Sequence, residues 1–156
     1  MLDIFVDADA CPVKQEVYRV AGRHGLQVTL ASNKSMRTPD GNRVKLVVVS
    51  DGLDAADDWI VEQAGEDDIV ITADILMVAR CIEKKALVLG PTGRPFTEEN
   101  IGDILATRNL MAELREAGIE GGGPAPFKPK DRSRFLHALD EMILSVRRKR
   151  GTGTRK

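Results

Sequence analysis

Short apolar segments alternate with helical patterns along this chain, and this alternation limits the fold more than any other feature. Five segments have the length and composition of buried strands, at residues 2–7, 26–31, 44–49, 68–72 and 86–89. The segment 44–49 is almost entirely apolar, which is typical of a strand covered on both faces. Strands that alternate with helices predict an α/β fold. We expect a three-layer sandwich around a mainly parallel five-stranded sheet, a Rossmann-like architecture.

Helical spacing of apolar residues predicts the elements between and after these strands, at residues 12–24, 54–63, 75–82, 97–118 and 131–146. Gly25 is placed to end the first helix, and Asp54 and Asp74 are natural N-caps. Residues 32–43 are polar and show no helix. A parallel crossover usually contains a helix, so the direction of the strand at 44–49 stays open.

The 156 residues fit one domain, which we place at 1–146. Residues 118–130 are rich in Gly and Pro and form a linker to the last helix. Residues 147–156 carry six basic side chains and no acidic one, and we expect a disordered tail there. With two cysteines and no long apolar run, the composition predicts a cytoplasmic protein with no membrane partner. The sequence leaves the oligomeric state open.

Aspartates gather where the predicted strands end. Because the carboxyl ends of parallel strands share one edge of the sheet, these side chains should converge there. Seven aspartates follow the strands in this way: Asp7, Asp9, Asp51, Asp54, Asp57, Asp58 and Asp74. Clustered carboxylates repel one another, and a bound cation relieves the repulsion. Short carboxylates suit Mg²⁺ or Mn²⁺, so the seven are candidate metal ligands. The alternative is that each one only caps a helix or completes a turn.

Five motifs resemble the YaiI/YqxD family of uncharacterised bacterial proteins. They are residues 7–14 (DADACPVK), 50–60 (SDGLDAADDWI), 72–75 (TADI), 90–97 (GPTGRPFT) and 131–136 (DRSRFL). The resemblance covers residues 2–146. One stretch departs from it, since Leu76, Met77 and Val78 stand where the family usually has Pro-Leu-Ala.

The family in turn resembles PIN-like and NYN-type nuclease domains. Those domains carry an Asp at the end of the first strand, acids at the start of a later helix and an Asp after the fourth strand. The matching positions here are Asp7, Asp54 with Asp58, and Asp74, which the resemblance implies as catalytic residues. It also implies a PIN-like fold and Mg²⁺- or Mn²⁺-dependent hydrolysis of phosphodiesters, with RNA as the partner.

Basic and hydroxyl side chains near the same edge are candidates for phosphate or nucleic-acid binding. They are Lys14, Lys34, Arg37, Thr92, Arg94, Arg132 and Arg134. Residues 90–94 form a Gly-rich turn between a strand and a helix, whose backbone could also cradle a phosphate. The alternatives are ordinary solvated charge and a tight turn.

Two other functions stay open. Asp7 and Asp9 after an apolar strand fit the Asp-x-Asp pair of a haloacid-dehalogenase-type phosphatase, although Cys11 matches that pattern poorly. The other is a non-catalytic module that binds RNA or protein, in which the acids are structural.

Overall fold

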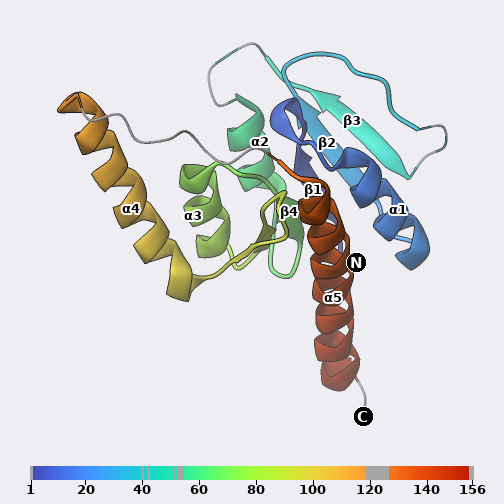
Figure 1. The fold of residues 1–156 in the computed structure, drawn as a ribbon. Helices are drawn as coiled ribbons and strands as arrows, with labels where there is room; N and C mark the ends of the chain where they lie inside the picture. The colour runs from blue at the N-terminus through green and yellow to red at the C-terminus, as the bar shows by residue number, and fades with distance from the viewer. Residues whose placement is uncertain are drawn as a thin grey trace.

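The computed structural model describes residues 2–39, 41, 43–50, 52, 55–118 and 127–154. Within these residues six strands form one sheet, in the order β3-β2-β1-β4-β5-β6 (Figure 1). The strands are β1 (Ile4–Asp7), β2 (Val28–Ser32), β3 (Val44–Val48), β4 (Ile69–Ile71), β5 (Leu87–Leu89) and β6 (Pro95–Phe96). The strands from β1 to β5 run parallel to their neighbours, and β6 runs antiparallel to β5. The predicted α/β fold and mainly parallel sheet are confirmed, with six strands in place of the expected five.

The additional strand, β6, has only the two residues Pro95 and Phe96. A segment this short has no periodicity that a sequence pattern could reveal. Pro95 also argues against a strand, because proline cannot donate to a ladder and is confined to sheet edges. It lies at such an edge here, as the last strand of the sheet.

The strand β3 lies parallel to β2, which settles the direction that the sequence left open. The described part of the connection between them contains no helix. The expectation that this segment is covered on both faces is wrong, because β3 is an edge strand and none of its residues is buried. Val48 has 53% of its surface exposed.

Helices cover both faces of the sheet (Figure 1). On one face, α1 (Lys14–His24) and α5 (Pro129–Thr154) pack on alternate strand residues in one apolar cluster. On the other face, α2 (Ala55–Gln63) and α3 (Ile75–Glu83) bury the opposite residues of the same strands in a second cluster. The residues alternate between the two clusters because successive strand side chains point to opposite faces.

Two helix ends follow the chemistry that the sequence indicates. Gly25 has φ +68° and ends α1, and its N–H donates to carbonyl oxygens of the last turn. Asp74 is the N-cap of α3, and its Oδ1 accepts from the backbone N–H groups of Leu76 and Met77 at 3.0 and 3.4 Å.

The last two helices are α4 (Glu98–Glu116) and α5, and α5 differs from expectation. The helix α4 lies against α3 (Figure 1), with most of its apolar side chains half-buried and Leu110 exposed. The helix α5 continues to Thr154, through most of the segment for which the sequence predicts a disordered tail. Most of the predicted linker, residues 119–126, lies outside the described residues. No helix in the described part of the chain is long and apolar enough to cross a membrane.

Candidate active site

The order of the strands reverses between β1 and β4. The chain leaves β1 toward β2 on one side of the sheet, whereas β4 continues to β5 on the other. The helices that follow these two strands, α1 and α3, cover opposite faces. In open α/β sheets, ligands bind beyond the carboxyl ends of the strands at such a reversal.

A cavity of about 230 Å³ lies at this position. It is lined by Asp7, Cys11, Ile71, Thr72, Ala73, Asp74 and Pro91. Its walls therefore come from the end of β1, the end of β4 and the turn after β5. We call it the acidic cavity. It brings together two of the predicted metal ligands, Asp7 and Asp74.

The hydroxyl of Thr72 connects these two aspartates. Thr72 is buried and lies next to Asp7, because Val6 and Ile71 are paired in the sheet. Its Oγ1 donates to Oδ2 of Asp7 at 3.1 Å and accepts from the backbone N–H of Asp74 at 3.1 Å. These bonds leave Oδ1 of Asp7 and Oδ2 of Asp74 without a hydrogen bond to any described residue.

The electrostatics of the acidic cavity disfavour a negative charge on Asp7. Burial raises the pKa of its carboxyl group above the usual value, and the neighbouring Asp9 and Asp74 raise it further. The hydrogen bond from Thr72 acts in the opposite direction, because it stabilises the carboxylate. A cation between Asp7 and Asp74 would relieve the repulsion.

Asp9 is engaged in a different contact. It lies in a single turn of 3₁₀-helix, Ala8–Ala10, directly after β1. Its Oδ1 accepts from the hydroxyl of Ser32 at 2.5 Å, and its Oδ2 accepts from the backbone N–H of Asn33 at 3.1 Å. Both oxygens thus hold the end of β2 against the end of β1.

Of the predicted ligands that follow β3, the structure describes Asp57 and Asp58, and neither lines the acidic cavity. Asp57 and Asp58 lie in the first turn of α2. The carboxylate of Asp58 is exposed and accepts from Arg80 of α3 at 2.7 Å. Asp51 and Asp54 lie outside the described residues. Within the described residues, no three side chains of His, Cys, Asp or Glu are grouped to hold a metal ion.

Cys11 lines the cavity but is a weak nucleophile there. Its side chain is buried, and burial raises the pKa of the thiol above its usual value. The thiol is therefore protonated at neutral pH and packs as a small apolar group.

The predicted phosphate-binding residues fall into two groups. Three have structural partners: Lys14 donates to the carbonyl of Cys11, Arg132 to the carbonyl of Pro12, and Arg134 pairs with Asp131. The guanidinium of Arg132 also contacts Glu16 and lies 4.9 Å from the ring centre of Phe127. The side chains of the other four bond to no described residue: Lys34, Arg37, Thr92 and Arg94.

Sequence reasoning missed Thr72 and Ser32 as parts of the site. Each comes at or directly after a strand end and bonds to an aspartate at or just after the end of β1. A hydroxyl residue at the end of an apolar segment is a pattern that the sequence does contain. Its meaning depends on the strand order, because only the order shows which aspartate lies beside it.

Comparison with known proteins identifies one family over nearly the whole chain. A family model described as an uncharacterized family, YaiI/YqxD, matches residues 5–145. A protein of Sphingopyxis alaskensis is 56% identical over 146 residues, covering 93% of this chain and 95% of the relative. A protein of Parvibaculum lavamentivorans is 56% identical over 150 residues, covering 96% and 98%. Both carry only the name UPF0178 protein. No solved structure matches the chain.

Proposed function

The chain belongs to the YaiI/YqxD family, and from that premise we propose that it hydrolyses RNA phosphodiester bonds with Mg²⁺ or Mn²⁺ at the acidic cavity. The family description assigns no reaction, so the proposal rests on the residues of this chain. The observation that carries it is the pair Asp7 and Asp74 on either side of the strand reversal. A PIN-like architecture, with aspartates after the first and fourth strands, is part of the same proposal.

The residues of the cavity fit a metal of this kind. Mg²⁺ is usually held by one or two carboxylates, with waters and substrate phosphate oxygens as its other ligands. Asp7 and Asp74 supply two carboxylates, each with one oxygen that bonds to no described residue. We propose Asp51 and Asp54, which follow β3, as further ligands. The carboxylates of Asp9 and Asp58 already accept hydrogen bonds from other side chains. We therefore propose that Asp9 and Asp58 support the site and do not bind the metal directly.

The fixed positions of the two carboxylates favour catalysis. Thr72 orients Asp7 through a part-buried hydrogen bond, and the start of α3 holds Asp74 by its N-cap bonds. The first turn of α3 also brings the positive end of a helix dipole to the site, which favours an anionic phosphate. Because both aspartates are held before substrate arrives, little reorganisation is needed.

A bound Mg²⁺ or Mn²⁺ would supply polarisation of the phosphate and a water of lowered pKa. Hydrolysis joins the water oxygen to phosphorus and breaks the bond from phosphorus to one ribose oxygen. That oxygen leaves with a proton, so the products are a phosphate monoester and a free hydroxyl.

The experiment is cleavage of an end-labelled single-stranded RNA by the full chain, in Mg²⁺, in Mn²⁺ and in chelator. We expect cleavage with metal, none with chelator, and a rate at least ~10²-fold lower for Asp7→Asn. The matched control is Asp3→Asn, which removes a carboxylate directly before the other end of β1. Equal cleavage by Asp7→Asn and the unaltered chain, or no cleavage by either, contradicts the proposal.

The same protein preparation distinguishes phosphodiester hydrolysis from the phosphatase alternative. A haloacid-dehalogenase-type enzyme would form an aspartyl-phosphate on Asp7 and release inorganic phosphate from monoesters. Retention of label from a phosphate monoester on the protein would therefore favour that reaction over phosphodiester hydrolysis.

A further inference from the structure

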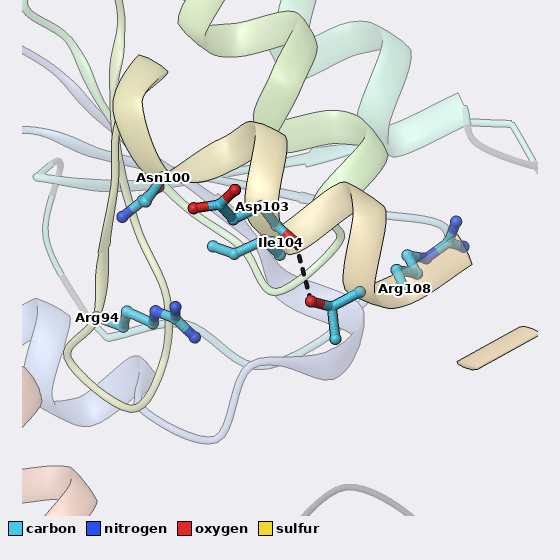
Figure 2. A pocket seen from close by; sticks show the side chains of 6 residues that line it. Arg94, Asn100, Asp103, Ile104 and Arg108 are labelled. Carbon is cyan, nitrogen blue, oxygen red and sulfur yellow. Dashed lines mark hydrogen bonds between the residues drawn. The ribbon is translucent and has the colours of Figure 1, made fainter. Parts of the chain in front are cut away.

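A second cavity, of about 510 Å³, lies between α4 and the turn that joins β5 to β6 (Figure 2). It is lined by Arg94, Asn100, Asp103, Ile104, Thr107 and Arg108. The volume is within the range of ligand sites in proteins, roughly 300–1,000 Å³. We call it the arginine cavity. Apart from Arg94, none of its residues is among the site residues that the sequence indicates.

One face of α4 forms most of this cavity. Positions 100, 103, 104, 107 and 108 follow helical spacing, so their side chains share a face. The start of that face is fixed: Thr97 and Asn100 exchange hydrogen bonds as N-cap and third helical residue, at 2.9 and 3.2 Å. Asn100 Nδ2 also donates to the carbonyl of Pro95 in β6 at 3.0 Å. The helix is thus tied to the strand that begins directly after Arg94.

The turn that carries Arg94 is fixed as well. Gly90 N donates to the carbonyl of Arg94, and Gly93 N donates to the carbonyl of Gly90, both at 2.9 Å. Gly93 has φ +88°, and a Cβ there would lie 2.8 Å from the backbone carbon of Arg134. The turn therefore lies directly on α5, which holds Arg94 opposite the face of α4 (Figure 2).

The charges of the cavity suit a phosphate beside a hydroxyl. Arg94 and Arg108 have exposed guanidinium groups that make no ion pair with any described residue. Arginine binds phosphate through two parallel hydrogen bonds. The carboxylate of Asp103 lies in the same lining and has no described side-chain partner. A carboxylate repels phosphate but accepts from a hydroxyl, and RNA carries a 2′-hydroxyl next to each phosphate.

The arginine cavity and the acidic cavity border the same turn. Pro91 lines the acidic cavity and Arg94 lines the arginine cavity. They are three positions apart in the chain, so their Cα atoms lie within about 11 Å. A single-stranded RNA whose backbone occupies the arginine cavity therefore reaches the acidic cavity within a few nucleotides.

We infer that the arginine cavity binds the backbone of single-stranded RNA, with Arg94 and Arg108 on its phosphates and Asp103 on a 2′-hydroxyl. The choice of RNA rests on the proposed function. The binding itself does not require metal or hydrolysis.

The test is fluorescence anisotropy of labelled single-stranded RNA and of DNA with the corresponding sequence, in chelator, across a series of salt concentrations. The variants are Arg94→Gln with Arg108→Gln, Asp103→Ala, and Arg19→Gln as the control. Arg19 is an exposed arginine of α1 that does not line the cavity, so its replacement removes one positive charge outside the cavity. RNA cleavage by the unaltered chain is measured in parallel with metal.

We expect the double arginine variant to bind RNA at least about tenfold more weakly and to lose about 1.4 from the salt slope, the value for two phosphates. Asp103→Ala should reduce the preference for RNA over DNA, and Arg19→Gln should bind nearly as the unaltered chain does. Equal binding by the double variant, or no binding of RNA by the unaltered chain, overturns the inference. Binding that depends on Arg94 and Arg108 without any cleavage supports it while contradicting the proposed hydrolysis.

Discussion

Thr72 donates a hydrogen bond to Asp7 across the junction of β4 and β1, at 3.1 Å. The same hydroxyl accepts from the backbone N–H of Asp74. One hydroxyl oxygen thus links the carboxylate of Asp7 to the backbone of Asp74. Thr72, which directly follows β4, therefore contributes to the site through its hydroxyl group.

Replacing Thr72 by Val keeps the shape of the side chain and removes the hydroxyl. Loss of this part-buried hydrogen bond should lower the free energy of unfolding by ~1 kcal/mol. Because Asp7 is no longer oriented, Mn²⁺ affinity should fall at least ~10-fold. Calorimetric titration and thermal unfolding measure the two effects, and Thr72→Ser retains the hydroxyl as a control. Unchanged affinity in Thr72→Val would show that this bond does not orient the site.

Asp7→Asn should raise the melting temperature of the metal-free protein at neutral pH. Burial and two neighbouring carboxylates raise the pKa of Asp7, so its ionised form is disfavoured in the folded state. An amide removes that repulsion and can still accept from Thr72. Thermal unfolding in chelator measures the change, with Glu141→Gln, an exposed side chain of α5, as the control. A lower melting temperature for Asp7→Asn would contradict the electrostatic account of the cavity.

Replacement by alanine should change the stability of the protein in opposite directions at Gly93 and Gly102. At Gly93, φ is +88° and a Cβ would meet the backbone of Arg134 at 2.8 Å. We therefore expect Gly93→Ala to destabilise the protein by at least ~1 kcal/mol. Gly102 lies within α4 with nothing within 4 Å of an added Cβ, so Gly102→Ala should stabilise by ~0.5–1 kcal/mol. Chemical denaturation measures both, and equal responses would contradict the packing of the turn on α5.

The stability contributed by the contact between α1 and α5 should depend on pH, because Asp140 takes part in that contact. The hydrogen bond with His24, at 2.7 Å, lowers the pKa of this carboxyl group, and Arg23 lowers it further. Because the pKa of Asp140 is lower in the folded state, its carboxylate stabilises the fold at pH values above the unfolded pKa, about 3.9. This stabilisation disappears as the pH falls through the folded pKa.

Asp140→Asn should therefore melt at a lower temperature than the unaltered chain near neutral pH, and the difference should vanish in acid. Melting curves across pH measure this. Glu141→Gln, one position along the same helix, serves as the control. A difference that is constant from neutral pH into acid would mean that the ion pair contributes nothing.

Local chemistry was sufficient to predict several parts of the structure. The cap at Asp74 and the helix end at Gly25 depend only on a few neighbouring residues, and both are confirmed. The position of Asp7 at the end of a buried strand is equally local. Once the strands are assigned, parallel pairing brings Asp7 and the residues after β4 to one edge.

The remaining features depend on contacts that are distant in sequence. An apolar segment such as Val44–Val48 looks the same at the centre or the edge of a sheet, and only the strand order makes it an edge. The four-residue spacing of Asp54 and Asp58 predicts a shared helix face, but Arg80 of another helix determines where Asp58 is held. The two bonds of Asp9 to the end of β2 likewise follow from pairing of β1 with β2.

The most direct test of the central claim is calorimetric titration of Mg²⁺ and Mn²⁺ into the full chain, Asp7→Asn, Asp74→Asn and the control Asp3→Asn. Asparagine is also a good N-cap, so Asp74→Asn should keep α3 intact. We predict that the unaltered chain and Asp3→Asn bind the metal, and that both other variants lose binding while remaining folded by thermal unfolding. Equal binding by all four proteins, or no binding by any of them, would contradict a metal site formed by Asp7 and Asp74.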